Sequence, residues 1–317
     1  MLSVDKFSID LADADTLAGF YLQQTSTDTR FLQMNTGAAI LEAQSIDLGD
    51  LCVMRVSGNG KHLWTDNMVS HEWRFAVLAQ AEGSPKIGDQ DIAKTTAHLL
   101  RPGQSSDLLT NGYYTTLEIS FSQDFAQNYG WDCLPHQTAE IDYSVSKALS
   151  QVANRMFSGF SLASTPRLAT SDTWDAQAAI LDLLDVALHP WQRPDFDQTR
   201  AHGSRTSGHI VQETWKLLAD NDYVIDTSVS ALAQEIGVSK RSMFQAFKNQ
   251  YGVGPRRFHE LLRLNALRSC LYYAADGGNS VTSLANEHGF SELGRMAGKY
   301  RALFGELPST TLSRRPI

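Results

Sequence analysis

Two copies of one local pattern in the last third of the chain constrain its fold most strongly. In each copy, a short segment rich in small residues ends at a glycine, Gly237 in the first and Gly289 in the second. A bulky apolar residue and then a serine, Ser239 or Ser291, follow the glycine. Glycine accepts the positive φ of a tight turn, and serine can cap the next helix. Because the two glycines lie 52 residues apart, we predict two helix-turn-helix motifs, a motif that lays its second helix in the major groove of DNA.

These residues resemble the AraC/XylS family of bacterial transcription regulators. The resemblance covers roughly residues 206–312, and its most specific parts are Gly289-Phe290-Ser291, Tyr300-Arg301, Phe304-Gly305 and Pro308. The segments 293–295 and 300–305 are similar to regulators of the ethanolamine-utilisation type. Two positions depart from the family pattern, since Met296 stands where the family usually has phenylalanine and Leu267 where it usually has alanine. Both remain apolar, so we expect the fold to be kept.

The charge of the chain is divided unequally between its two parts. The net charge is −8, yet residues 205–317 carry 14 lysines and arginines against 10 acidic residues, a balance of +4. Residues 1–204 carry 13 basic and 25 acidic residues, a balance of −12. Phosphate binding is a local property of one face, so the modestly basic part can bind DNA while the acidic part points away from it.

The composition is that of an ordinary globular protein. The 317 residues suffice for two domains, and 42% are hydrophobic and 20% charged. No apolar run reaches the roughly 20 residues that a membrane span needs, and the first residues do not form a secretion signal. Three scattered cysteines, Cys52, Cys133 and Cys270, fit reduced thiols. We therefore expect a cytoplasmic protein without membrane contact.

The fold class that we predict is α+β with two domains. Residues 1–190 form an effector-sensing and dimerisation domain, 191–206 a linker and 207–317 an all-α DNA-binding domain with the two motifs. Short runs of β-branched and aromatic residues between about 37 and 125, separated by turn residues, predict a β-barrel. In the family, such a barrel is commonly of the cupin type. Residues 113–121 alternate in character, which predicts a strand buried on one face only.

Two amphipathic helices are expected between about 140 and 189, as a helical hairpin. Apolar residues recur every three or four positions from Ile141 to Met156 and from Trp174 to Leu188. These stripes either cover the barrel or form a self-association surface, and the resemblance favours a homodimer. The segment after His189 has prolines, glycines and polar residues without apolar periodicity, which indicates a linker.

The candidate DNA-binding residues lie on the second helix of each motif. They are Lys240, Arg241, Phe244, Gln245 and Lys248 in the first motif and Arg295, Lys299 and Arg301 in the second. The resemblance places Arg241, Phe244 and Gln245 at base-contacting positions. Arginine pairs with guanine and glutamine with adenine, whereas Phe244 either touches a thymine methyl or belongs to the core. Gly294, Ala297 and Gly298 offer almost nothing to a base edge, so we expect the first motif to read sequence and the second to position the domain.

The amino-terminal half contains no recognisable catalytic or metal-binding cluster. His62, His71 and His98 are dispersed without a His-x-His pair, so we expect neither a metal nor another cofactor. Aromatic residues that either line an effector pocket or form core are Trp64, Trp73, Phe75, Tyr113 and Tyr114. The resulting hypothesis is a sequence-specific DNA-binding transcription regulator with a small-molecule effector and RNA polymerase as partners. The resemblance to the family favours an activator over a repressor. The alternative is a cupin-type enzyme or binding protein with a helical accessory domain.

Overall fold

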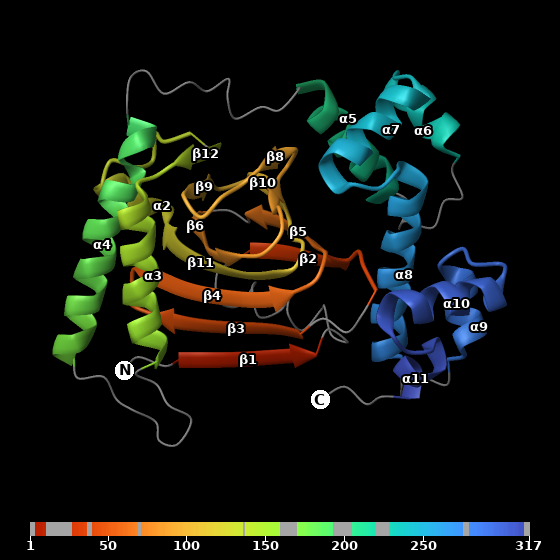
Figure 1. The fold of residues 1–317 in the computed structure, drawn as a ribbon, viewed down its shortest axis with the longest axis horizontal. Coiled ribbons are helices and arrows are strands. Elements are labelled where there is room, and N and C mark those ends of the chain that lie inside the picture. Colours follow the sequence, from red (N-terminus) through yellow and green to blue (C-terminus); the bar gives the residue numbers. More distant parts are fainter. Residues whose placement is uncertain are drawn as a thin grey trace.

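A computed structural model describes residues 4–10, 27–36, 40–68, 71–135, 137–158, 170–192, 205–219, 228–274 and 279–313. They form a strand-rich amino-terminal domain flanked by helices and an all-helical carboxy-terminal domain (Figure 1). The predicted α+β class with two differently built domains is therefore confirmed. Most of the expected linker, residues 193–204, lies outside the described residues.

The amino-terminal strands form two antiparallel sheets. The larger sheet has the order β1 (Val4–Asp10), β3 (Ile40–Asp47), β4 (Leu51–Asn59), β11 (Tyr113–Ser122), β6 (Glu72–Ala81), β9 (Thr96–Leu100) and β12 (Gln137–Glu140). The smaller sheet has the order β2 (Thr27–Gln33), β5 (His62–Met68), β10 (Ser105–Leu109), β7 (Lys86–Ile87) and β8 (Gln90–Asp91). Strands thus extend beyond the predicted range of 37–125 at both ends. Within the described ranges the two sheets face each other without closing into one barrel.

The larger sheet is covered on both faces. Helices α2 (Gln123–Asn128), α3 (Tyr143–Ser158) and α4 (Thr170–Gln192) pack on its outer face, and Figure 1 shows α3 and α4 there as two adjacent helices. Its inner face meets the smaller sheet. For this reason β11 is buried along nearly its whole length, and the expectation that this strand is buried on one face only is wrong.

The two apolar stripes of the helical hairpin face this core. On α3, Leu149, Ala153 and Met156 are buried, with Val145 and Val152 partly buried against the same cluster. On α4, Leu184 and Leu188 are buried in it and Leu181 is partly buried, whereas Ala178 is exposed and the side chain of Trp174 lies outside the described part of the structure. The stripes therefore cover the larger sheet, which is the first of the two readings that the sequence allowed.

The carboxy-terminal domain is built around one long central helix. Helix α8 (Pro255–Tyr273) has α5 (Arg205–Ala219), α6 (Val229–Ile236) and α7 (Lys240–Tyr251) at one end. Helices α9 (Val281–Glu287), α10 (Leu293–Phe304) and α11 (Pro308–Ser313) lie at its other end. Pro255 occupies the first turn of α8, where its missing N–H leaves no bond unmade.

The smaller sheet joins the two domains by packing its outer face on the helical domain. Leu32, Met34, Leu63 and Leu109 belong to the same apolar cluster as the leucines of α8. Because strand side chains alternate, this face is opposite the one that meets the larger sheet. Among the described residues, no helix is both long and apolar enough to cross a membrane.

Candidate nucleic-acid interface

The first motif is formed by α6 and α7 and has the turn that its sequence predicts. Gly237 ends α6 with a left-handed φ of 76°, which glycine adopts without steric cost. The hydroxyl of Ser239 then accepts a hydrogen bond from the Ser242 amide at 3.0 Å. This bond satisfies one of the free amides in the first turn of α7.

The second motif, α9 and α10, has the same glycine but a different helix start. Gly289 has a φ of 71°, as expected. Ser291 does not cap α10, however, because this helix begins later, at Leu293, with Glu292 in the capping position and no side-chain bond to the first turn. Instead, Arg263 of α8 donates to the carbonyl oxygens of His288 and Gly289 and stacks on Phe290 at 4.3 Å. An arginine that could have been a phosphate ligand therefore braces the turn.

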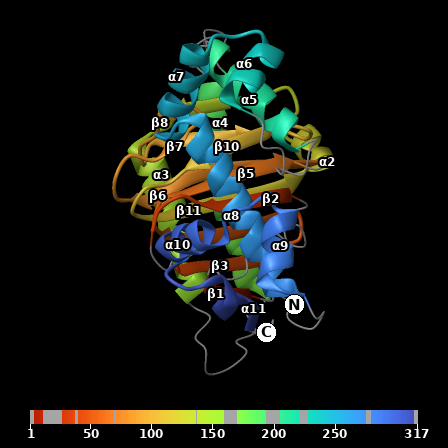
Figure 2. The ribbon, with the colours of Figure 1, turned by 90° about the vertical axis from the view of Figure 1, so that its right-hand side faces the viewer.

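The long helix α8 sets the distance between the two motifs. With 19 residues it is about 28 Å long at 1.5 Å per residue. Figure 2 shows α7 and α10 on the same side of α8, one at each end. Successive major grooves on one face of B-DNA are about 34 Å apart. The arrangement suits insertion of the two helices into neighbouring major-groove segments.

The candidate residues of the first motif lie on the exposed side of α7. Lys240, Arg241, Gln245 and Lys248 are exposed, whereas Met243 and Phe247 are buried beneath them. The Gln245 amide donates to Asn249 at 2.6 Å, and the ammonium of Lys248 bonds to the carbonyl of Gly252 at 3.2 Å. Arg241 and Gln245 are one turn apart, so both can face one groove.

Phe244 is exposed on the same helix, with 48% of its surface accessible. Its ring lies close to Gly254, because a Cβ at Gly254 would approach a ring carbon to 2.6 Å. The ammonium of Lys248 lies 5.8 Å from the ring centre. Phe244 therefore rests on the start of α8 and keeps a free edge for a thymine methyl.

The candidate cations of the second motif have acidic neighbours. Arg295 forms an ion pair with Glu292 at 2.8 Å, and Lys299 pairs with Glu260 of α8. Arg301 is exposed. Gly294 and Gly298 leave open space above the helix, since a Cβ at either would meet no atom within 4 Å. The helix can thus approach a DNA backbone closely.

The five aromatic candidates for an effector pocket lie in three places. Trp64 and Tyr114 meet between the sheets, where the indole N–H donates to the Tyr114 hydroxyl at 3.0 Å. Trp73 and Phe75 are buried on the outer face of the larger sheet, beneath the helices. Tyr113 lines a hollow on that outer face. Of the five candidates, only Trp64 and Tyr114 therefore meet between the two sheets.

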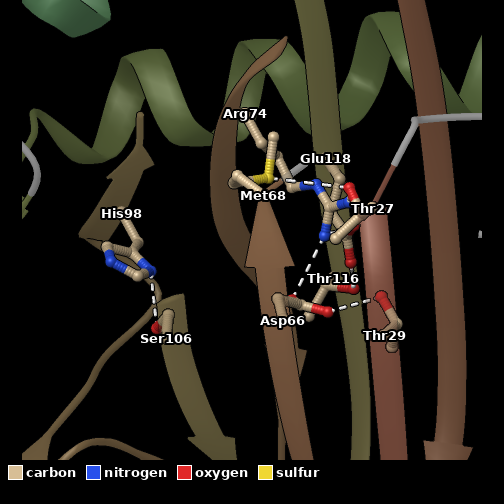
Figure 3. Close-up of polar contacts among 9 residues, drawn as sticks. All are labelled: Thr27, Thr29, Asp66, Met68, Arg74, His98, Ser106, Thr116 and Glu118. Atoms are coloured by element: carbon tan, nitrogen blue, oxygen red, sulfur yellow. Dashed lines mark hydrogen bonds and ion pairs between the residues drawn. The ribbon is translucent and has the colours of Figure 1, made fainter. Parts of the chain in front are cut away.

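A charged cluster that the sequence did not reveal lies between the sheets (Figure 3). Arg74, only 1% exposed, pairs with Asp66 of the facing sheet at 3.1 Å and with Glu118 at 3.3 Å. Arg74 also donates to Thr27, and Thr29 donates to Asp66 at 2.6 Å. Side chains from both sheets make this cluster, so it couples their positions. The sequence does not reveal this cluster, because its members come from four strands that extend from Thr27 on β2 to Glu118 on β11.

A second unforeseen set of contacts joins the recognition helices to the smaller sheet. At the end of α7, the Tyr251 hydroxyl donates to Asp107 at 2.5 Å and Gln250 donates to the same carboxylate at 3.2 Å. Burial raises the pKa of Asp107, and it outweighs the hydrogen bonds from Tyr251, Thr65 and Gln250, which lower it. At the end of α10, the Gln33 amide donates to the carbonyl of Leu303 at 2.9 Å.

Comparison with known proteins places the carboxy-terminal domain in a family. Residues 232–314 match a protein family described as a helix-turn-helix domain. The XylDLEGF operon transcriptional activator 2 of Pseudomonas putida is 40% identical over 86 residues, which are 27% of this chain and 55% of that protein. The transcriptional activator RhaS of Pectobacterium carotovorum is 29% identical over 250 residues, 75% of this chain and 84% of that protein.

The first of these relatives is matched over only about half of its length, 55%. Among solved structures, a probable AraC family transcriptional regulator from Rhodopseudomonas palustris is 32% identical, with 34% of this chain and 99% of that chain covered and a TM-score of 0.32. None of the relatives named here is described as an ethanolamine-utilisation regulator, so that finer likeness stays a prediction. The matched sequence, with its two motifs on one central helix, assigns the carboxy-terminal domain to the AraC/XylS family of transcription regulators.

Proposed function

We propose that the protein is a sequence-specific transcription activator that binds promoter DNA through α7 and α10 and works with RNA polymerase. The observation that carries this proposal is the placement of both recognition helices on one side of α8, one at each end of a helix about 28 Å long. The exposed Arg241 and Gln245 supply side chains that can distinguish guanine and adenine. The activators among the relatives support activation over repression.

A mobility-shift titration with the DNA upstream of the protein's own operon tests this function. We expect a discrete complex whose affinity falls steeply with salt, by about 1,000-fold between 50 and 200 mM if at least six phosphates are contacted. An unrelated DNA of equal length is the control. Absence of any complex at low salt would favour the alternative, a cupin-type enzyme or binding protein with a helical accessory domain.

The amino-terminal domain is proposed to sense a small molecule and to pass the signal through the way the domains dock. The contacts of Asp107 with Tyr251 and of Gln33 with Leu303 tie both recognition helices to one sheet. A ligand shifts regulation only through a different affinity for the docked and undocked arrangements. Trp64 and Tyr114 border the space between the sheets and are the aromatic candidates that can act together there.

Lengthening the linker by several Gly and Ser residues tests the docking proposal. We expect DNA binding and ligand binding to persist, while the effect of the ligand on transcription becomes smaller. Cross-linking within one protomer, from the smaller sheet to α7, reports the docking directly. An unchanged cross-linking yield at saturating ligand, with transcription still switching, would contradict the docking proposal.

Homodimerisation through the helical hairpin is proposed as well. Val145 and Val152 are unsuitable for testing it, because both pack against the domain core. Val186 on α4 is 56% exposed, so Val186→Asp changes the outer surface without opening the core. We expect this substitution to weaken self-association in sedimentation experiments. If Val186→Asp leaves the dimer unaltered, the dimer interface lies elsewhere on the protein.

A further inference from the structure

A hollow of about 320 Å³ lies on the outer face of the larger sheet, beside α3. It is on the opposite side of that sheet from the smaller sheet and the charged cluster. Its floor comes from β3, β4, β11 and β6, and its wall from α3. Its charged lining residues are Arg55 and Glu42, and its neutral polar lining includes Gln44, Ser57, Gln80, Thr115 and Asn154.

The outer face of the larger sheet changes from apolar to polar at the hollow. Farther along the same face, Val53, Ile119 and Phe75 are buried under the helices. At the hollow, α3 no longer covers the sheet, yet Thr115 is buried and Arg55 is only partly exposed. The pairing of β11 with β6 shifts register here, between Thr115 and Thr116, which leaves Ala79 as an extra residue in the floor. Such bulges re-aim side chains and are common beside binding sites.

Arg55 is the organising side chain of this hollow. Its guanidinium donates to the Asn154 side-chain oxygen at 2.7 Å and to that of Gln44. It also lies 4.8 Å from the ring centre of Phe157. Both bonded oxygens belong to neutral amides. The exposed carboxylate of Glu42 also lines the hollow and acts on Arg55 at longer range, but the two described side chains form no ion pair, so the guanidinium stays open to a ligand. A fixed, partly desolvated guanidinium favours a carboxylate, which it can bind through two parallel hydrogen bonds.

The neighbouring row of side chains carries hydroxyl and amide groups. Ser57 and Thr115 hydrogen bond across the strands at 2.9 Å, and Thr115 donates to the Tyr113 hydroxyl at 3.3 Å. Gln80 pairs with Thr115 across the bulge and is exposed at the rim. Groups that both donate and accept match the hydroxyls of a polyhydroxylated molecule. The volume suits a ligand the size of one sugar.

We propose that this hollow binds a small hydroxylated carboxylic acid of the sugar-acid class, with its carboxylate on Arg55 and its hydroxyls along Ser57, Thr115 and Gln80. Because Arg55 also holds Asn154 of α3, a ligand carboxylate there bears directly on the contact between the sheet and the helical hairpin. The site lies outside the space between the sheets, so it goes beyond the effector response proposed above.

Calorimetric titration of the full chain without DNA tests the proposal. The probes are D-gluconate, D-glucuronate and D-galacturonate, with sorbitol, glucose and galactose as neutral counterparts and acetate as a carboxylate without hydroxyls. We expect at least one acid to bind at submillimolar concentration, and its neutral counterpart and acetate to bind about tenfold or more weakly.

Three variants place the binding in this hollow. Arg55→Gln should weaken the acid at least about tenfold, and Ser57→Ala should weaken it less, because it removes one neutral hydrogen bond. The matched control is Arg30→Gln, which removes an exposed arginine from a strand of the other sheet. We expect that control to bind as the unaltered chain does, with circular dichroism confirming that all three variants are folded.

Two results would overturn the site. One is the failure of every acid in the panel to bind at about 10 mM. Any binding that escapes detection at this concentration is too weak to be specific. The other is binding that neither Arg55→Gln nor Ser57→Ala alters. That result would mean that the acid binds at another site on the protein. If Arg55→Gln does not fold, Ser57→Ala alone decides. Since no DNA is present, either failure leaves the proposed promoter binding untouched.

Discussion

The two recognition helices have the same fold and opposite surface chemistry. Helix α7 begins at a serine cap and carries Arg241 and Gln245 on an exposed face, where neither contacts an acidic side chain of the described residues. Helix α10 has no side-chain cap, its Arg295 and Lys299 pair with glutamates, and its outward face has Gly294 and Gly298. Similar scaffolds at the two ends of α8 thus support two tasks. We infer that α7 reads bases and that α10 holds the backbone.

The largest expected effect is on base specificity. Replacing one arginine in each recognition helix separates base reading from backbone binding. Arg241→Ala should cost about 1–3 kcal/mol at a single base pair, the value of a bidentate guanine contact. Arg295→Ala should weaken binding less and evenly for all sequences, because Glu292 already offsets its charge. Binding to a panel of single-base variants of the operator measures both. Equal, sequence-independent losses from the two substitutions would abolish the distinction.

The next effect concerns the starts of the two helices. Ser239→Ala removes the cap of α7 and should destabilise its first turn by about 1 kcal/mol. Ser291→Ala is the matched control, since Ser291 caps nothing in α10 and should leave that helix unchanged. Hydrogen exchange of the peptides that contain each first turn reports the local stability. Faster exchange in both variants would mean that Ser291 stabilises the motif by another route.

A smaller effect concerns the ion pair that holds Lys299. Glu260→Gln removes the acidic partner of Lys299 and also that of Arg257, which should free both for phosphate and strengthen DNA binding by roughly twofold to threefold at low salt. The slope of log affinity against log salt should become steeper by up to about 0.9 for each cation that reaches a phosphate. Glu213→Gln in α5 is the control, because it removes the same charge from another lysine pair, with Lys216. The same gain in both variants would indicate a net-charge effect instead.

The smallest expected effect on DNA binding concerns pH. Asp107 ties the end of α7 to the smaller sheet, and its pKa when docked is raised above the ordinary 3.8 by burial. A raised pKa favours the docked state at low pH, and docking weakens as the pH rises through the pKa that Asp107 has in the docked state. The end of α10 is held by the neutral Gln33 and should not respond in this way.

Hydrogen exchange at the ends of α7 and α10 between about pH 4 and pH 7 checks this asymmetry. The α7 end should become less protected, relative to the intrinsic rates, as the pH rises. Asp107→Asn should remove that dependence while it keeps a side chain that can bond Tyr251. A pH response of equal size at both ends, or one that survives in Asp107→Asn, would contradict the assignment to Asp107.

Much of the helical domain could be predicted from the sequence, because its signals are local. Gly237 and Gly289 sit at the turns that their conformational freedom predicts, and Pro255 begins the long helix. Ser291 failed as a cap because α10 starts one residue later than the parallel with Ser239 implied. The brace from Arg263 to the turn could not be foreseen, since it joins positions 25 residues apart on different helices.

The amino-terminal domain was less predictable because its structure depends on pairing between distant strands. The alternation in 113–121 placed Tyr114 and Glu118 correctly on one face, but it could not show that helices cover the other. The aromatic candidates illustrate the same limit. Trp64 and Trp73 differ in surroundings because they lie on different sheets, and nothing in their local sequence distinguishes a residue between the sheets from one beneath α3 and α4.

The apolar cluster shared between the smaller sheet and α8 has a practical consequence for fragments of this protein. Cleavage in the segment between the domains would leave Leu32, Leu63 and Leu109 on one piece and their leucine partners on the other, all exposed to water once the pieces separate. Newly bared apolar patches promote aggregation. The isolated halves should therefore be less soluble than the intact chain, and should co-purify when a protease has cut the linker.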